Sequence, residues 1–143
     1  MEKEKRSFKI GEVYFMEFCG RGNEQNGWRP GVVFQNDIGN EHSPNIIALP
    51  LTTAIKKAGM PTHVVLPSDE TGLPKDSMVL CENPECISKT RIGEYITRIP
   101  DSYMEKIAEA NIYATSAIAF INPESLIYIW QKASTMVAAK VGK

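Results

Sequence analysis

The stretch that decides how the rest of the chain is interpreted is residues 20–37, GRGNEQNGWRPGVVFQND. Its first half is polar and rich in glycine, which is typical of a loop. Its second half contains the apolar run 32–34, which predicts a buried strand. Arg29 lies at the junction, and Pro30 behind it disfavours helical geometry and holds Arg29 extended. This arginine either meets a ligand at the mouth of the loop or makes an ordinary, weak surface ion pair.

Length and composition predict a single domain without a membrane segment. The chain has 143 residues, of which 43% are hydrophobic, and this is enough for one core. No apolar run approaches the roughly 18 residues of a membrane-spanning helix. The charged N-terminus MEKEKRSFK is not followed by an apolar segment, so no signal peptide is predicted and a cytoplasmic location is expected.

The charge and the cysteine content exclude few classes of function. The net charge of −1 neither indicates nor rules out a nucleic-acid-binding protein, because a local groove can be basic. The three cysteines, Cys19, Cys81 and Cys86, are expected to be reduced thiols. Cys81 and Cys86 are too far apart for a CxxC zinc knuckle, and no other cluster suggests a metal. No metal site is therefore predicted.

Short apolar runs separated by turns predict a mainly β domain, a small barrel or sandwich. The expected strands are residues 11–19, 31–35, 46–51, 62–66, 78–81, 87–92 and 94–99. The last two are expected to form a hairpin around Gly93. Pro50 inside the third run indicates an edge, a bulge or a strand end. Residues 36–40 carry turn chemistry, and residues 52–57 are expected to form one helical turn.

One helix is predicted to begin near Pro100, where Ser102 and Glu105 fit a capping box. Its inward face is predicted by helical spacing to consist of Met104, Ile107, Ala108, Asn111, Thr115 and Ile118. A second helix is expected over residues 125–139, either packed on the barrel or ordered against a partner. The chain thus divides into a barrel with its helix, residues 1–118, and a C-terminal extension, residues 119–143.

Several segments match a known family when they are taken in order. They are Gly11-Glu12-Val13-Tyr14, EQNGWRP at 24–30, VVFQND at 32–37, Asn40 with Ser43-Pro44, Leu51-Thr52-Thr53, PTHV at 61–64, Gly72-Leu73, Lys75-Asp76-Ser77 and the strand at 78–82. Together they resemble the MazF/PemK family of toxin endoribonucleases. The resemblance runs in unbroken order from about residue 8 to about residue 118.

The resemblance implies a fold, an activity and partners. The implied fold is an SH3-like barrel with a C-terminal helix that works as a homodimer. The implied activity is cofactor-free, metal-independent cleavage of single-stranded RNA at a short sequence, blocked by a cognate antitoxin. The family's catalytic pair is the arginine of the RP motif and the threonine after the third strand, which here match Arg29 and Thr52.

The residue types of this pair suit attack of a 2′-hydroxyl on the neighbouring phosphate, which leaves 2′,3′-cyclic phosphate and 5′-hydroxyl ends. The planar fork of Arg29 can hold two phosphate oxygens, and Thr52 can donate its hydroxyl hydrogen to the same phosphate. A guanidinium with a pKa above about 12 resists losing its proton. Arg29 is therefore expected to stabilise charge, and either Glu24 or solvent to accept the 2′-hydroxyl proton.

Further RNA contacts are predicted around the pair, at Asn23, Glu24, Gln25, Trp28, Thr53, Asn83 and Arg91. Trp28 either stacks on a base or covers the barrel mouth. Thr53 either contacts RNA or caps the short turn. His63 is expected to be a satisfied structural histidine.

The chain departs from the family pattern after Glu82. Asn83, Pro84 and Glu85 follow where family members commonly carry a glutamine and an arginine. Glu85 removes positive charge from the expected RNA groove, and Arg91 either compensates or is only an exposed strand residue.

Two other functions fit the same fold. Gyrase-poisoning toxins share it and cut nothing, so fold alone does not decide. A catalytically weak homologue that only binds RNA or antitoxin is the other alternative, in view of Glu85. A gyrase poison would not need the pair Arg29 and Thr52, which therefore favours the nuclease. The expected partners are single-stranded RNA, an antitoxin protein and a second copy of the chain, with no membrane.

Overall fold

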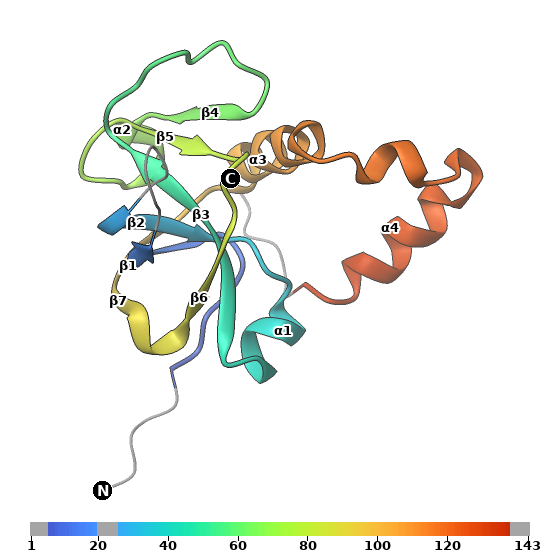
Figure 1. Cartoon of the computed structure of the whole chain (residues 1–143), viewed down its shortest axis with the longest axis horizontal. Coiled ribbons are helices and arrows are strands. Elements are labelled where there is room, and N and C mark those ends of the chain that lie inside the picture. Colours follow the sequence, from blue (N-terminus) through green and yellow to red (C-terminus); the bar gives the residue numbers. More distant parts are fainter. Residues whose placement is uncertain (1–5, 20–25, 138–143) are drawn as a thin grey trace, which may run out of the picture.

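The computed structural model describes residues 6–19 and 26–137, with the backbone alone at residue 26 (Figure 1). Within these residues, seven antiparallel strands form one sheet in the order β4-β5-β3-β2-β1-β7, and β6 pairs with β3. The strands are β1 (Glu12–Cys19), β2 (Asn26–Val33), β3 (Asn45–Thr52), β4 (His63–Leu66), β5 (Ser77–Leu80), β6 (Glu85–Ser88) and β7 (Ile92–Arg98). The predicted mainly β barrel with a C-terminal helix is confirmed.

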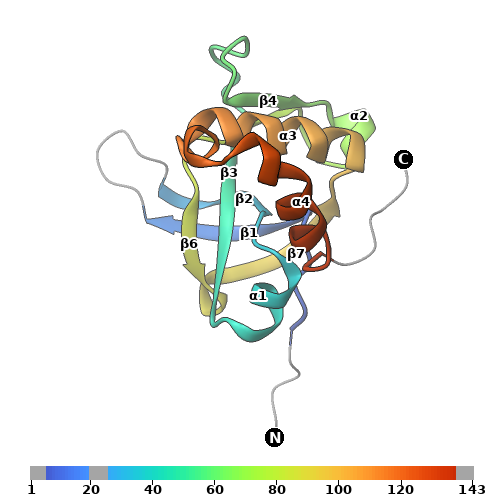
Figure 2. The ribbon, with the colours of Figure 1, turned by 90° about the vertical axis from the view of Figure 1, so that its right-hand side faces the viewer.

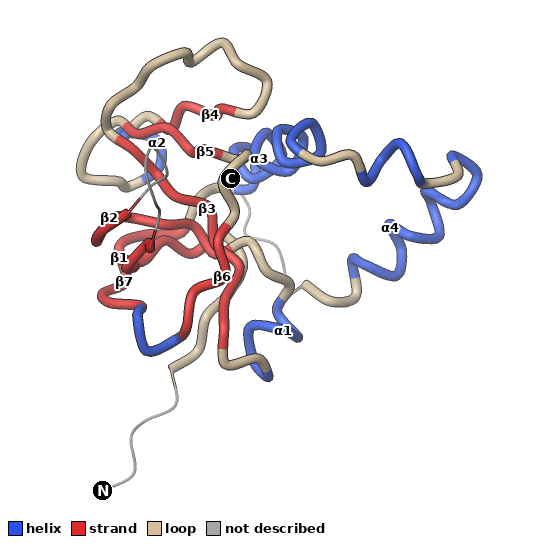
Figure 3. Tube along the Cα trace, in the orientation of Figure 1, coloured by secondary structure: helices blue, strands red, loops and turns tan. Residues whose placement is uncertain are grey.

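The helical elements lie mostly in the second half of the chain. They are α1 (Asp37–His42), α2 (Ser68–Thr71), η1 (Lys89–Arg91), α3 (Asp101–Ala114), η2 (Ala117–Phe120), η3 (Pro123–Ser125) and α4 (Leu126–Ser134). Figure 3 shows the strands gathered together and the C-terminal helical segment standing apart from them. Viewed from that side, α3 lies next to β4 and α4 lies between α3 and α1 (Figure 2).

β3 is the strand that organises the sheet, because three others pair with it. Residues 45–48 pair with β6, residues 48–50 with β2 and residues 51–52 with β5. Pro50 lies opposite Gly31 of β2, between the residues of β3 that pair with β6 and those that pair with β5 on the other edge. Pro50 therefore marks an irregular point inside the strand, and β3 runs on to Thr52.

β2 begins earlier than predicted, at Asn26, so Arg29 and Pro30 lie inside the strand and not at its entrance. The reason is the length of β1, whose second half pairs with residues 26–30. Pro30 is tolerated because β3 pairs with β2 only over residues 31–33. A Cβ at Gly31 would come within 2.8 Å of the Phe18 ring and 2.9 Å of the Met16 sulfur, so a larger residue there would force these two buried side chains to move.

The core consists of two clusters of buried apolar side chains. One lies between the sheet and α3 and includes Val13, Leu49, Val79 and Ile107. The other is lined by β1, β2, β3, β6 and β7 and includes Met16, Phe18, Val33, Ile46, Ile87 and Ile92. Several of these side chains are 0% exposed, which fixes the strands that carry the site.

α3 starts where the sequence predicts, but without the capping box. Pro100 is the N-cap, and its carbonyl accepts hydrogen bonds from the backbone N–H groups of Tyr103 and Met104 at 2.9 and 3.1 Å. Ser102 is thus already inside the helix and cannot cap it. The predicted inward face of α3 is confirmed at Met104 and Ile107, which pack in the core.

Asn111 also faces inward as predicted: it is partly buried and donates to the Cys81 carbonyl at 3.4 Å. The rest of that face differs from the prediction, and Ala110, not Ala108, is buried. Thr115 and Ile118 are exposed, since α3 ends at Ala114. The second predicted helix forms as α4, but it stops at Ser134, short of the predicted end.

Three local predictions are wrong. β6 and β7 do not form a hairpin: η1 separates them, β6 pairs with β3 and β7 with β1. Residues 52–57 form a bend, not a helical turn, and Lys57 has a left-handed φ of 53°. Residues 37–42 form α1, because the Asn36 side chain accepts from the Gly39 N–H at 2.9 Å and caps a helix, not a plain turn.

Candidate active site

Arg29 and Thr52, the two residues predicted to act together, line the same pocket. It measures about 230 Å³ and is bounded by Arg29, Pro30, Leu51, Thr52, Thr53 and Ser77. The sheet brings these residues together because β2 and β5 both pair with β3 near its end. Thr52 is the last residue of β3 and Ser77 the first of β5.

The Thr52 hydroxyl is set up to donate a hydrogen bond. Its Oγ1 accepts the backbone N–H of Ala54 at 3.1 Å. An accepted bond occupies a lone pair and leaves the hydroxyl hydrogen available to an acceptor in the pocket. This assigns the turn cap to Thr52 and not to Thr53, for which the cap was one of the two expected roles. Thr53 is exposed and lines the pocket, and its carbonyl accepts from the Ile55 N–H at 3.1 Å.

Arg29 enters the pocket from a rigid strand. It is paired with Met16 of β1 and is partly buried, so the sheet fixes its Cα position. A guanidinium fork held in this way is suited to a planar, two-oxygen contact with an anion such as a phosphate.

Ser77 belongs to the pocket but was not among the predicted site residues. It is 4% exposed, and its hydroxyl donates to the Lys75 carbonyl at 2.9 Å. Because the hydroxyl hydrogen of Ser77 is already donated, its oxygen can only accept further hydrogen bonds. Ser77 therefore lines the pocket without donating a hydrogen bond to a phosphate. Its sequence signal was weak: a hydroxyl residue at the start of a strand has many structural roles.

Trp28 lies on the other face of β2 from Arg29, since successive strand residues point to opposite faces. Its indole is 57% exposed and reaches across β1 to Gly93, where an added Cβ would come within 3.3 Å of the ring. Trp28 does not line the pocket. Its exposed ring remains a candidate stacking surface outside the pocket.

Asn83 and Arg91 also lie outside the pocket. Asn83 is exposed in the turn between β5 and β6. Arg91 closes η1 and is not a strand residue; its Nη2 donates to the Glu17 carbonyl at 2.6 Å and to the Cys19 sulfur. Its Nε is 3.4 Å from the Glu17 carboxylate. Arg91 thus ties η1 to the end of β1.

Glu85 is held at the same end of β1. Its carboxylate accepts the backbone N–H of Cys19 at 2.9 Å. Its negative charge therefore sits beside the segment that leads into residues 20–25 and does not line the Arg29 pocket. The predicted contacts Asn23, Glu24 and Gln25 lie outside the described residues.

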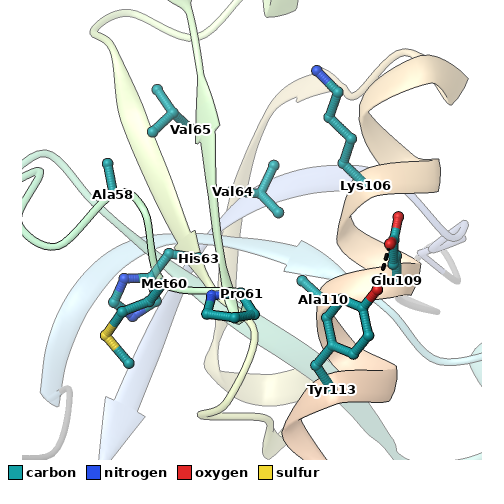
Figure 4. Close-up of a pocket in the computed structure, with 10 residues that line it drawn as sticks. All are labelled: Ala58, Met60, Pro61, His63, Val64, Val65, Lys106, Glu109, Ala110 and Tyr113. Carbon is teal, nitrogen blue, oxygen red and sulfur yellow. Dashed lines mark hydrogen bonds between the residues drawn. The ribbon is translucent and has the colours of Figure 1, made fainter.

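His63 is a satisfied structural histidine, as predicted. Its side chain is 7% exposed, with Nδ1 at 2.9 Å from the Lys57 carbonyl and Nε2 at 2.8 Å from the Glu82 carboxylate. It fastens the bend after β3 to the end of β5. It also borders a larger hollow of about 400 Å³ between β4 and α3 (Figure 4). Neither Arg29 nor Thr52 reaches that hollow, so the smaller pocket is the candidate active site.

The cysteines and acidic groups add no further chemistry to the pocket. Cys19 and Cys86 are exposed, and Cys81 is buried. Burial, with Glu82 nearby, raises the pKa of the Cys81 thiol to about 12, so this thiol stays protonated at neutral pH. Across the described parts of the chain, no three His, Cys, Asp or Glu side chains group closely enough to hold a metal ion. The same residues contain no helix with the length and apolar character to cross a membrane.

The family model for the PemK-like, MazF-like toxin of type II toxin-antitoxin systems matches residues 9–112. The endoribonuclease EndoA of Bacillus subtilis is 41% identical over 113 residues, covering 78% of this chain and 97% of EndoA. The endoribonuclease MazF of Staphylococcus saprophyticus is 39% identical over 101 residues, covering 70% of this chain and 84% of that protein.

Solved structures give the same result. A mycobacterial endoribonuclease in complex with its cognate antitoxin superposes with a TM-score of 0.62 at 27% identity, covering 80% of this chain and 98% of that one. MazF from Deinococcus radiodurans has a TM-score of 0.67 at 21% identity, covering 82% and 100% of the two chains, and supports the fold.

The fold and the pocket define a small β-barrel protein that carries an arginine and a threonine where three of its strands meet. The chain belongs to the PemK-like, MazF-like toxin family of type II toxin-antitoxin systems.

Proposed function

We propose that the chain is an endoribonuclease toxin that cleaves single-stranded RNA at a short sequence without a metal ion. The observation that supports this most is that Arg29 and Thr52 line one pocket. Two relatives at about 40% identity bear the name endoribonuclease. The 2′-hydroxyl attacks the adjacent phosphate and leaves 2′,3′-cyclic phosphate and 5′-hydroxyl ends.

In this proposal the side chains of Arg29 on β2 and Thr52 on β3 both bind the scissile phosphate. The Arg29 fork binds two of its oxygens and offsets the charge that builds on the phosphorane. Thr52 donates the hydroxyl hydrogen that its bond from Ala54 leaves available. One preorganised donor of this kind is typically worth about 3–4 kcal/mol of barrier. Glu24 or solvent accepts the 2′-hydroxyl proton, because a guanidinium holds its own proton too firmly.

The proposed partners are an antitoxin and a second copy of the chain. The mycobacterial relative at 27% identity forms a complex with its cognate antitoxin, which supports inhibition of this chain by a protein of its own system. The toxin acts as a homodimer in the cytoplasm, where messenger RNA and antitoxin are both available. Trp28, Thr53, Asn83 and Arg91 are proposed to contact RNA beyond the scissile phosphate, together with residues 23–25.

A gyrase poison on the same barrel is the second candidate. The relatives' names and the Arg29–Thr52 pocket favour RNA cleavage over this alternative. Besides the apolar Pro30 and Leu51, the pocket is lined by one guanidinium and three hydroxyl groups, and this polar set suits a phosphodiester.

The test is incubation of the pure protein with a long single-stranded transcript in EDTA. We expect discrete fragments with 5′-hydroxyl ends from the wild type and from Thr115→Val, at an exposed position after α3 outside the pocket, and strong loss of cleavage in Thr52→Val. Intact RNA with a folded wild-type sample would contradict the proposal. DNA breaks in the presence of gyrase, without RNA cleavage, would support the second candidate instead.

A further inference from the structure

The last residues of β1, 17–19, extend beyond the part of the strand that β7 covers. Among the described pairs, β7 meets β1 from Glu12 to Met16, and Met16 lies opposite Ile92. The residues before Ile92 turn away as η1 and do not continue β7. β7 therefore leaves the outer edge of residues 17–19 uncovered. A backbone N–H or C=O group at such an edge needs a partner other than a strand.

Two side chains take the place of a strand at this edge. The Glu85 carboxylate accepts the backbone N–H of Cys19 at 2.9 Å. Arg91 Nη2 donates to the Glu17 carbonyl at 2.6 Å. Glu17 and Cys19 are alternate residues of one strand, so their backbone groups point to the same edge. Together the two side chains offer one acceptor and one donor, and we call this pair of contacts the β1 clasp.

Both side chains of the β1 clasp start from backbone that the core holds. Glu85 is the first residue of β6 and lies opposite Ala48 of β3, which is 0% exposed. Arg91 ends η1 directly before the buried Ile92, and its Nη2 also contacts the Cys19 sulfur. Figure 2 shows the end of β1 beside β6. The clasp therefore joins the end of β1 to a fixed part of the barrel.

The strand end that the clasp holds is paired with the segment that carries Arg29. Residues 17–19 pair with residues 26–28 of β2, and Met16 pairs with Arg29. Among the described pairs, β3 joins β2 only from Gly31 onward. Arg29 therefore lies at the base of a two-stranded ribbon, whose outer end is attached through the clasp. A two-stranded ribbon is marginally stable unless further contacts hold it.

We propose that Glu85 is a positioning residue for RNA cleavage, which acts with Arg91 through β1. Its bond to Cys19 holds the β1–β2 ribbon in the orientation that directs Arg29 into the pocket. Glu85 itself does not line the pocket. The inference rests on the proposed nuclease function. It gives Glu85 a supporting role, whereas the sequence alone suggested only a loss of positive charge from an RNA groove.

The two interpretations of Glu85 predict opposite effects of one substitution. A lysine at this position adds positive charge, which favours contact with RNA phosphates, so a purely electrostatic role predicts better cleavage. Lysine has donors and no acceptor, so in Glu85→Lys the Cys19 N–H loses its partner. Glutamine removes the charge but keeps an oxygen that can accept the same bond. Glu85→Gln therefore separates the accepted hydrogen bond from the charge.

The test measures cleavage of a single-stranded transcript in EDTA by the full chain over a range of RNA concentrations. We expect kcat of Glu85→Lys to fall on the order of tenfold, because a small displacement of Arg29 weakens its contact with the transition state. KM should not rise, since the added charge favours RNA binding. Glu85→Gln should keep kcat within about threefold of the wild type. Glu124→Lys, an equal charge change at an exposed position outside the family match, is the control and should cleave like the wild type.

Hydrogen exchange followed by NMR gives a second readout that needs no RNA. The Cys19 amide should exchange on the order of tenfold faster in Glu85→Lys than in the wild type or in Glu85→Gln. The amide of Leu49, a 0% exposed residue of β3, should keep its exchange rate in all three proteins. A wild type that leaves RNA intact would contradict the nuclease proposal, whereas the exchange rates would still test the clasp.

Three results would overturn the inference. The first is a kcat of Glu85→Lys that equals or exceeds that of an active wild type. The second is an equal loss of kcat in Glu85→Gln and Glu85→Lys, which would assign the effect to the charge and not to the accepted bond. The third is unchanged exchange of the Cys19 amide in Glu85→Lys, or an equally large change at Leu49, which would mean that the whole barrel is loosened.

Discussion

The two tryptophans of the chain are exposed to nearly the same extent, 57% for Trp28 and 60% for Trp130, but their surroundings are opposite. Trp28 lies on a strand that pairs with β1 and β3, next to Arg29, which lines the pocket. Trp130 lies on a helix with no buried residue, in a segment outside the family match. Exposure alone therefore does not assign a role. The barrel carries the pocket, whereas the segment after α3 leaves its large apolar side chains exposed.

The largest effect is expected at Arg29. Arg29→Lys keeps the charge but loses the fork, and we expect single-turnover RNA cleavage to fall by about 10²–10³-fold. Arg98→Lys is the matched control on β7, away from the pocket, and should cleave like the wild type. Full activity of Arg29→Lys would show that two-oxygen geometry is not what the pocket provides.

The second prediction compares the barrel core with α4 by their contributions to the free energy of unfolding. Ile107 is 0% exposed between α3 and the sheet, so Ile107→Ala should cost about 2–5 kcal/mol of unfolding free energy. Ile127 is 63% exposed, and Ile127→Ala should change it by no more than about 0.5 kcal/mol in dilute protein. Urea unfolding of both variants measures the difference. Equal losses would mean that α4 is part of the folded core.

The third prediction uses the two tryptophans directly. In a Thr52→Val background, which keeps RNA intact, Trp28→Ala should weaken RNA binding by about 1–3 kcal/mol if a base stacks on the indole. Trp130→Ala, at a similarly exposed tryptophan outside the family match, is the matched control and should leave RNA binding unchanged. Fluorescence anisotropy with labelled RNA measures the affinity of both variants. Equal RNA affinities of the two variants would mean that no base stacks on Trp28 and that its indole only covers the sheet.

The smallest effect concerns the thiols. Cys19 and Cys86 are exposed, whereas burial raises the pKa of Cys81 to about 12. At pH 8 the Cys81 thiolate is therefore scarce, and a thiol reagent should modify two cysteines in the native protein and the third only after unfolding. Cys81→Ser should leave the native count unchanged. Fast modification of Cys81 at pH 8 would show that the barrel opens more readily than its packing indicates.

Much of the barrel could be predicted because its signals are local. The apolar runs gave most strands, and the ordered motifs placed Arg29 and Thr52 in one site. The partners of β6 and β7 could not be predicted: both depend on long-range pairing with β3 and β1, and the sequence between them resembles a hairpin turn. The length of β2 was missed for the same reason, since it follows from pairing with β1.

The remaining errors come from residues with two possible roles. Asn36 starts a helix with the same hydrogen bond that would close a turn. Pro100, not Ser102, is the N-cap of α3, because the fixed φ of the proline and its free carbonyl are sufficient to begin the helix. Arg91 and Glu85 were predicted from charge alone, but their hydrogen bonds to the end of β1 are set by the tertiary structure.

The central claim is that Arg29 and Thr52 act on one phosphate, and a double-mutant cycle on RNA cleavage tests it most directly. Single-turnover rates of Arg29→Lys, Thr52→Val and the double variant are compared with the wild type in EDTA. If both side chains bind the same phosphate, the double variant should be faster than the product of the two losses predicts, with a coupling of about 0.5–3 kcal/mol. Strictly independent losses, or no loss in either single variant, would contradict the account.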